Sequence, residues 1–230
     1  MEAIAEPLRV LGAAVAYTSA YAIGILLFAW MARRRGLATE GVRLIVIAAI
    51  AGGLGGAVIG QLIVGETGGK TILGGVAGGF LAVVLAKRSI GLKRPIGDLF
   101  AVAIAGGEAV GRLGCFIGGC CYGKIASVPW AVEDHGAWRH PTQLYSSACA
   151  ALTLAILLRL EKHANLPENA LFYIQGMLMC LSRFIIEFYR EPGAVAGVLT
   201  VAQWACFAGF LFFTFLALRL LPPVHRTVAA

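Results

Sequence analysis

The chain has 230 residues, of which 59% are hydrophobic and only 13% are charged. So few charged residues cannot cover the water-facing surface of a soluble domain, and the composition therefore predicts an all-α integral membrane protein. In a soluble chain, a net charge of +7 would suggest nucleic-acid binding. Here Lys and Arg instead cluster beside long apolar runs, as they do where a membrane protein fixes its orientation, so we expect no nucleic-acid partner.

Seven apolar segments follow one another along the chain at lengths suited to membrane-crossing helices. Basic clusters follow alternate segments, so the positive-inside rule predicts about seven spans with the N-terminus outside and the C-terminus cytoplasmic. Acidic residues rather than a basic stretch precede the first segment, which favours a retained helix over a cleaved signal peptide. We expect a single transmembrane domain over residues 1–230, with an outward-facing loop around 118–142. The predicted spans are 10–32, 42–64, 71–86, 96–117, 143–158, 170–188 and 201–221.

The stretch 106–123, GGEAVGRLGCFIGGCCYG, places polar side chains in a run of glycines that lets backbones pack closely. Arg112 lies near the outer end of the fourth predicted span, where a cation normally pairs with an anion or faces a polar cavity. A phosphate headgroup would serve as partner, and so would Glu108, one helical turn earlier. The alternative is an Arg side chain that only extends to the membrane interface.

The sixth predicted span ends with three charged residues on one helical face. Arg183 and Glu187 are four residues apart, and Arg190 follows about one turn later. Such a stripe would neutralise a bound phosphate while the carboxylate holds both cations in position. An intramembrane ion pair that only fixes the helix bundle is the alternative interpretation.

His140 precedes the fifth predicted span, with Pro141 at a position that suits a helix start. Its imidazole would act as a base or would only cap the loop. Gln143 and Tyr145 follow on the first turn of that span.

Three of the six cysteines, Cys115, Cys120 and Cys121, lie in or beside the glycine-rich stretch. A thiolate nucleophile near Arg112 and an oxidised pair in an outward-facing loop both fit this pattern. Adjacent cysteines form a poorer zinc chelate than a C-x2-C turn, so we expect no metal here and no cofactor.

Taken together, these motifs resemble the prolipoprotein diacylglyceryl transferase family. The resemblance rests on Gly111-Arg-Leu-Gly114, on residues 139–145 (RHPTQLY) and 183–192 (RFIIEFYREP), on Gln203-Trp204 and on Tyr17. It implies a seven-span enzyme of the bacterial inner membrane, with its site towards the outer leaflet. Such an enzyme moves the diacylglyceryl group of phosphatidylglycerol onto a cysteine thiol of a prolipoprotein.

The resemblance also implies roles for single residues. Arg112 and Arg183 would handle the phosphate, Glu187 would orient them, and His140 completes the expected catalytic set. The expected substrate-binding residues are Arg190, Tyr145, Gln143, Glu108, Gly114 and Tyr17.

Several polar residues of the family are replaced in this chain. The His that precedes two glycines in the family's third span is Leu73 here, so the base that takes the thiol proton is not identified. Two further hypotheses follow: a divergent phospholipid-dependent enzyme with another acceptor or a cysteine-based intermediate, and a non-catalytic membrane protein that binds or transports a lipid or an anion. The other replacements are Val58, Cys115, Gly118, Cys120 and Ser146.

Overall fold

The computed structural model describes residues 2–37, 39–64, 72–191 and 195–220. This part of the chain forms seven α-helices: α1 (Glu2–Arg34), α2 (Thr39–Val64), α3 (Ile72–Ser89), α4 (Gly97–Ile117), α5 (Thr142–His163), α6 (Ala170–Glu187) and α7 (Val201–Leu220). Among the described residues, six helices, all but α3, are long and apolar enough to cross a membrane. The prediction of an all-α integral membrane protein with several spans is confirmed.

Each predicted span coincides with a helix, but some helices continue where charged residues follow. Helix α1 begins at Glu2 rather than at residue 10, and α5 continues to His163, beyond the predicted end at residue 158. A predicted span ends where apolar residues end, whereas a helix continues through Arg, Glu and Lys because these residues favour helix. The third predicted span corresponds to α3, which begins beside residues outside the described ranges.

The contacts divide the chain into two compact units, residues 29–95 and residues 1–28 with 96–230. In the unit formed by residues 29–95, α2 and α3 pack through glycines. A Cβ atom added at Gly56 would lie 2.8 Å from the Cα of Gly78, and one at Gly78 would lie 2.7 Å from the Cα of Gly56. Small residues thus let these two helices approach closely. The single transmembrane domain stays a prediction.

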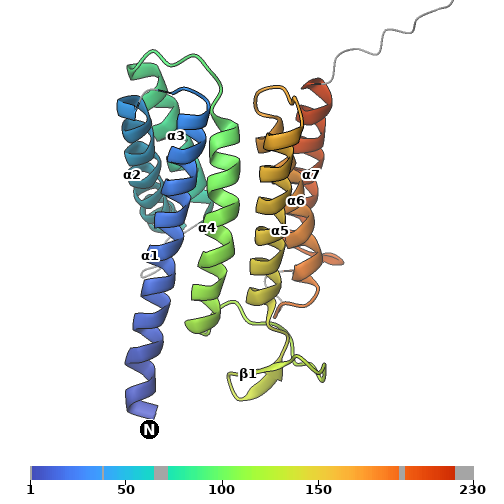
Figure 1. Ribbon diagram of the computed structural model, residues 1–230. Coiled ribbons are helices and arrows are strands. Elements are labelled where there is room, and N and C mark those ends of the chain that lie inside the picture. Colours follow the sequence, from blue (N-terminus) through green and yellow to red (C-terminus); the bar gives the residue numbers. More distant parts are fainter. Residues whose placement is uncertain (1, 38, 65–71, 192–194, 221–230) are drawn as a thin grey trace, which may run out of the picture. The chain divides into compact units, whose positions relative to one another are not determined.

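In the larger unit, α4, α5 and α6 pack against one another and α7 packs on α6. Successive helices run in opposite directions, so α4 and α6 end where α5 and α7 begin (Figure 1). Leu99, Val102, Leu157 and Leu171 are almost completely buried between these helices. The end of this unit that holds the C-termini of α4 and α6 is called the hairpin end below.

A β-hairpin, which the sequence analysis did not predict, lies in the expected loop 118–142. Strands β1 (Val132–Asp134) and β2 (Ala137–Arg139) pair antiparallel, with Asp134 opposite Ala137. The two turn residues, His135 and Gly136, both have positive φ angles of 52° and 71°. Tight two-residue hairpin turns require such angles. A second short pair, β3 (Val195–Ala196) with β4 (Leu199–Thr200), precedes α7.

Candidate active site

A small cavity of about 40 Å³ lies between α4, α5 and α6 near the hairpin end. A volume of this size holds one or a few water molecules, so the cavity accepts a polar group rather than a whole lipid. Both predicted arginines of α4 and α6 reach it. The polar residues of its lining are Glu108, Arg112, Ser146, Thr153, Gln175, Ser182 and Arg183.

Arg112 and Glu108 form the ion pair that their spacing on α4 predicts. The Nη2 atom of Arg112 lies 3.1 Å from Oε1 of Glu108, and its Nε atom donates to the same oxygen at 3.3 Å. Both side chains are about three-quarters buried. Because both line the cavity, the pair places one positive and one negative group at its wall.

Glu187 is shared by two arginines, as the spacing on α6 also predicts. Its Oε2 atom lies 2.8 Å from Nη2 of Arg183 and 3.7 Å from Nε of Arg190, and its side chain is only 5% exposed. The hydroxyl of Thr200 donates to its other oxygen at 3.4 Å. With Arg112 and Glu108, three cations therefore face two carboxylates at this end of the unit.

The Arg183 guanidinium is incompletely satisfied. Its Nη1 atom is buried without a hydrogen-bond partner among the described residues. The 2.8 Å contact from Nη2 to Glu187 is an ion pair that lacks hydrogen-bond geometry, since the same carboxylate oxygen also has no hydrogen bond. Buried donors normally have partners, so a free donor beside a polar cavity indicates space for an acceptor such as an anion.

The end of α4 turns back over its own last turn. Gly119 has a φ angle of 66° and donates to the carbonyl of Phe116 at 3.2 Å, while Cys120 donates to the carbonyl of Cys115 at 3.1 Å. This is the Schellman motif, in which a left-handed residue closes a helix. As a consequence, Cys120 lies next to Cys115 instead of continuing away from α4.

The next residues pair with the segment that follows α6. Gly123 and Arg190 form an antiparallel bridge, and the amide of Lys124 donates to the carbonyl of Tyr189 at 2.9 Å. A Cβ atom at Gly123 would lie 2.7 Å from that carbonyl oxygen, so only glycine fits. The pairing brings Arg190 beside Cys121.

Two residues of the RHPTQLY motif hold the same loop from α5. The hydroxyl of Thr142 donates to the carbonyl of Cys121, and the amide of Gln143 donates to the carbonyl of Cys120, both at 2.8 Å. Both side chains are almost completely buried. Gln143, expected to bind substrate, therefore fixes the cysteine loop in the structure.

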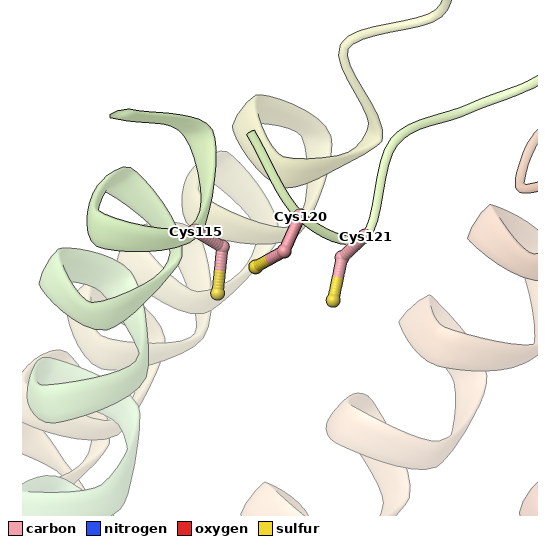
Figure 2. A group of neighbouring side chains, drawn as sticks. All are labelled: Cys115, Cys120 and Cys121. Atoms are coloured by element: carbon pink, nitrogen blue, oxygen red, sulfur yellow. The ribbon is translucent and has the colours of Figure 1, made fainter. Parts of the chain in front are cut away.

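The three cysteines of this region form one cluster (Figure 2). The sulfur atoms of Cys115, Cys120 and Cys121 all lie within 4.8 Å of one another, and all three residues are free cysteines. The hydroxyl of Tyr17 donates to the sulfur of Cys115 at 3.5 Å. Burial raises the pKa of Cys120. Chiefly the hydrogen bond from Cys115, and then the charge of Arg190, lowers the pKa of Cys121 to about 4.

Tyr17 and Gly114 contact each other. A Cβ atom at Gly114 would lie 3.0 Å from the ring of Tyr17, so the glycine provides the space in which the ring reaches the cysteine cluster. Two residues expected to bind substrate are thereby brought together, and the structure shows them packing against each other.

His140 lies in an aromatic cluster outside the cavity lining. Its Nδ1 atom is 3.1 Å from the hydroxyl of Tyr145, which also accepts from the indole of Trp130 at 2.7 Å. The ring of Tyr189 packs against the imidazole at a centroid distance of 5.2 Å. Only Nε2 of His140 is therefore available to a substrate. Its assignment as catalytic residue, like that of Tyr145 as substrate-binding residue, stays a prediction.

Arg139 is a structural residue that the sequence analysis did not single out. Its guanidinium donates to the carbonyl of Gly123 at 3.1 Å and to the carboxylate of Glu191 at 2.9 Å, and it lies over the ring of Tyr122. It thus ties the hairpin to the paired segments 122–124 and 189–191. The only signal in the sequence is its position in the RHPTQLY motif.

Asp98 was also missed, although it is almost completely buried. Its carboxylate accepts from the amides of Asn169 at 3.0 Å and Phe172 at 3.1 Å, and the Asn169 side chain in turn accepts from the amide of Gly97 at 3.1 Å. Asp98 therefore caps α6 from α4. An acidic residue in the first turn of α4 was the available signal, but it normally caps its own helix.

Comparison with known proteins agrees with these motifs. The family model described as prolipoprotein diacylglyceryl transferase matches residues 3–219. Proteins named phosphatidylglycerol--prolipoprotein diacylglyceryl transferase are similar over part of the chain. That of Geobacter sulfurreducens is 34% identical over 63% of this chain and 58% of its own length. That of Mesorhizobium japonicum is 36% identical over 55% and 48%, and that of Aeromonas hydrophila is 36% identical over 57% and 50%. The chain thus spans about half the length of the curated relatives it matches.

Proposed function

Since the chain belongs to the prolipoprotein diacylglyceryl transferase family, we propose that it transfers the diacylglyceryl group of phosphatidylglycerol to a cysteine thiol of a prolipoprotein. The names of the relatives supply this donor and acceptor. The observation that carries the proposal is the cavity to which Arg112 and Arg183 both contribute, with a buried Arg183 nitrogen that has no hydrogen-bond partner in the described part of the chain. A phosphate oxygen satisfies that nitrogen.

In the proposed reaction, the acceptor sulfur attacks the glyceryl carbon that bears the phosphate oxygen. The carbon–oxygen bond breaks, a carbon–sulfur bond forms, and glycerol phosphate leaves with the electron pair of the broken bond. The charge that develops on the leaving phosphate is stabilised by Arg112 and Arg183, which are already held in place by Glu108 and Glu187. The acyl chains stay in the bilayer because the cavity of about 40 Å³ accepts only the polar head.

The acceptor thiol must lose a proton. Glu108 lines the cavity, whereas His140 does not, so Glu108 is the base that the geometry favours. Leu73, at the position of the family's His, lies in α3 with its side chain outside the described residues.

A covalent intermediate on Cys115, Cys120 or Cys121 does not fit this chemistry. Attack by one of these thiolates would give a thioether, and a thiolate leaves poorly from an unactivated carbon. The second transfer, to the acceptor, would therefore be blocked. The proposal accordingly assigns the three cysteines no covalent step.

The site is proposed to face the outer leaflet of the bacterial inner membrane. Within the larger unit, the cavity lies near the hairpin end, whereas α5 and α7 end on the opposite side of the unit (Figure 1). The last two turns of α5 hold Arg159 and Lys162, and the last turn of α7 holds Arg219. Basic residues favour the cytoplasmic side, which supports the outward orientation of the hairpin end.

The experiment uses the purified full chain in phosphatidylglycerol nanodiscs with a labelled donor and a peptide that contains the acceptor cysteine. We expect release of glycerol phosphate in a one-to-one ratio with lipidated peptide. Binding of the donor without release would instead support the non-catalytic lipid-binding hypothesis, which the replacement of several family polar residues favours. Release of glycerol phosphate without peptide modification would support a different acceptor.

A further inference from the structure

The cysteine cluster has the dimensions of a metal site. Three thiolates that bind one ion at about 2.3 Å in a plane are separated by about 4 Å from one another. The sulfur atoms of Cys115, Cys120 and Cys121 already lie within 4.8 Å of one another without an ion. Small side-chain rotations would complete the site, and the backbone would not have to move.

The backbone explains how two adjacent cysteines present their sulfurs to the same point. In an extended chain, neighbouring side chains point to opposite sides. Cys121, however, has a φ angle of 62°, a conformation that is uncommon for a residue with a side chain. The carbonyl of Cys121 accepts a hydrogen bond from Thr142, and the carbonyl of the preceding residue, Cys120, accepts one from Gln143. These two bonds hold Cys121 in this conformation. The sulfurs consequently lie on the same side of the loop (Figure 2).

We propose that Cys115, Cys120 and Cys121 form a three-thiolate site for a soft monovalent cation, Cu(I). The ligand set is entirely sulfur, and among the described residues no imidazole or carboxylate joins the group. Thiolates select Cu(I) and Zn²⁺, but structural Zn²⁺ takes four ligands, whereas three thiolates satisfy Cu(I). On binding, every sulfur that still carries a proton loses it to solvent, and neither sulfur nor copper changes its oxidation state.

The charges beside the cysteine cluster and the groove next to it both suit a bound Cu(I) ion. Three thiolates around one monovalent cation carry a net charge of about −2, which needs compensation at a partly buried position. The guanidinium of Arg190, which also faces Glu187, lies beside Cys121 and offsets part of this charge. An open groove of about 520 Å³ is lined by Tyr17 and Cys120 among others, so one cysteine of the cluster is accessible from it.

This inference is independent of the proposed transferase activity, since it rests on the geometry and the surroundings of the three cysteines. The experiment titrates the reduced full chain in detergent with Cu(I), without oxygen, against a coloured Cu(I) chelator. We expect one tightly bound Cu(I) per chain. X-ray absorption at the copper edge should show three sulfur neighbours at about 2.3 Å. Two sulfur neighbours, or no binding in competition with the chelator, would overturn the proposal.

Serine variants identify the ligands. C115S, C120S and C121S should each weaken Cu(I) binding more than about 100-fold, beyond the effect of losing an outer-shell partner. The matched control replaces the three other cysteines together: C149S/C180S/C206S keeps all three proposed ligands and should bind like the wild type. Equal loss in this control would refute the assignment.

A second measurement avoids variants that fail to fold. Cu(I) should protect Cys115, Cys120 and Cys121 of the wild-type chain from maleimide, with the modified sites read by mass spectrometry. Protection of other cysteines in place of these three would contradict the site.

Discussion

The cavity and the cysteine cluster lie close together in the larger unit but are held by different interactions. At the cavity, each charged side chain is fixed by another on the same helix, Arg112 by Glu108 and Arg183 by Glu187. At the cluster, backbone bonds from α5 and from the segment after α6 fix the loop.

This difference separates two ways of placing reactive groups. A pair on one helix keeps its geometry as long as that helix is intact. The geometry of the loop, by contrast, depends on segments that are distant in sequence. It should be lost whenever one of these segments shifts. Substitutions at the cavity should therefore change the rate of glycerol phosphate release and leave the cysteine cluster intact. Substitutions around the loop should disturb the cluster and leave that rate unchanged.

The largest effect is expected from Arg112→Ala. Loss of one of the two cations that stabilise the leaving phosphate should lower the rate of glycerol phosphate release at least about 1,000-fold. Thiol reactivity of Cys120 should stay close to that of the wild type, because the hydrogen bonds that hold the loop among the described residues come from Thr142, Gln143 and the segment after α6. The control is Arg159→Ala, which removes an exposed arginine at the other end of α5. An active Arg112→Ala chain would contradict the assigned phosphate role.

Asp98→Ala tests the helical frame that carries both arginine pairs. It removes the carboxylate that caps α6 from α4 and leaves two amides without an acceptor. We expect the free energy of unfolding to fall by about 2–3 kcal/mol, the range for hydrogen bonds to a charged group. Thermal unfolding in detergent measures this. Asp98→Asn keeps one acceptor and should lose about half as much; an Asp98→Ala chain as stable as the wild type would show that the cap does not stabilise the frame.

The helices and their charge pairs could be predicted from the sequence because both follow local periodicity. Arg183, Glu187 and Arg190 fall on one face by spacing alone, and the structure contains both of the pairs expected there. The loop could not be predicted in this way. Gly119 is a recognisable helix stop, but nothing local indicates that Gly123 pairs with Arg190, far along the chain.

The expectation that the adjacent cysteines hold no metal also rested on local sequence alone. Adjacent cysteines form a poor chelate when the backbone between them has ordinary angles, because their side chains then point to opposite sides. The left-handed angle at Cys121 removes that objection, and only tertiary contacts make it stable. The hairpin turn at His135 was unpredicted for the same reason. In the sequence, only the glycine that follows His135 indicates a positive φ angle.

A methyl group added at Gly123 (Gly123→Ala) should disturb the loop more than a methyl group added at any other position of the loop. The added Cβ atom would lie 2.7 Å from the carbonyl of Tyr189, so the paired segments must separate. We expect the free energy of unfolding to fall by about 2 kcal/mol, typical of overpacking, and the cysteines to react faster with maleimide. Gly55→Ala is the control, because a Cβ atom there meets nothing within 4 Å. Unchanged thiol reactivity would show that the pairing does not hold the cluster.

The smallest effect is expected from Thr142→Val, which removes one hydroxyl and keeps the side-chain shape. Its hydrogen bond to the Cys121 carbonyl is lost, so the left-handed angle of Cys121 is held less firmly. Because the Thr142 hydroxyl bonds the backbone carbonyl of Cys121, it is a positioning residue. Cu(I) affinity should therefore fall about tenfold, as for outer-shell partners of other metal sites. The control is Thr214→Val, because the native Thr214 hydroxyl donates to the carbonyl of Phe210 within α7 and contacts the sulfur of Met177, far from the loop in sequence. A Thr142→Val chain with wild-type Cu(I) affinity but lower thermal stability would show that this hydroxyl stabilises α5 without orienting the thiols.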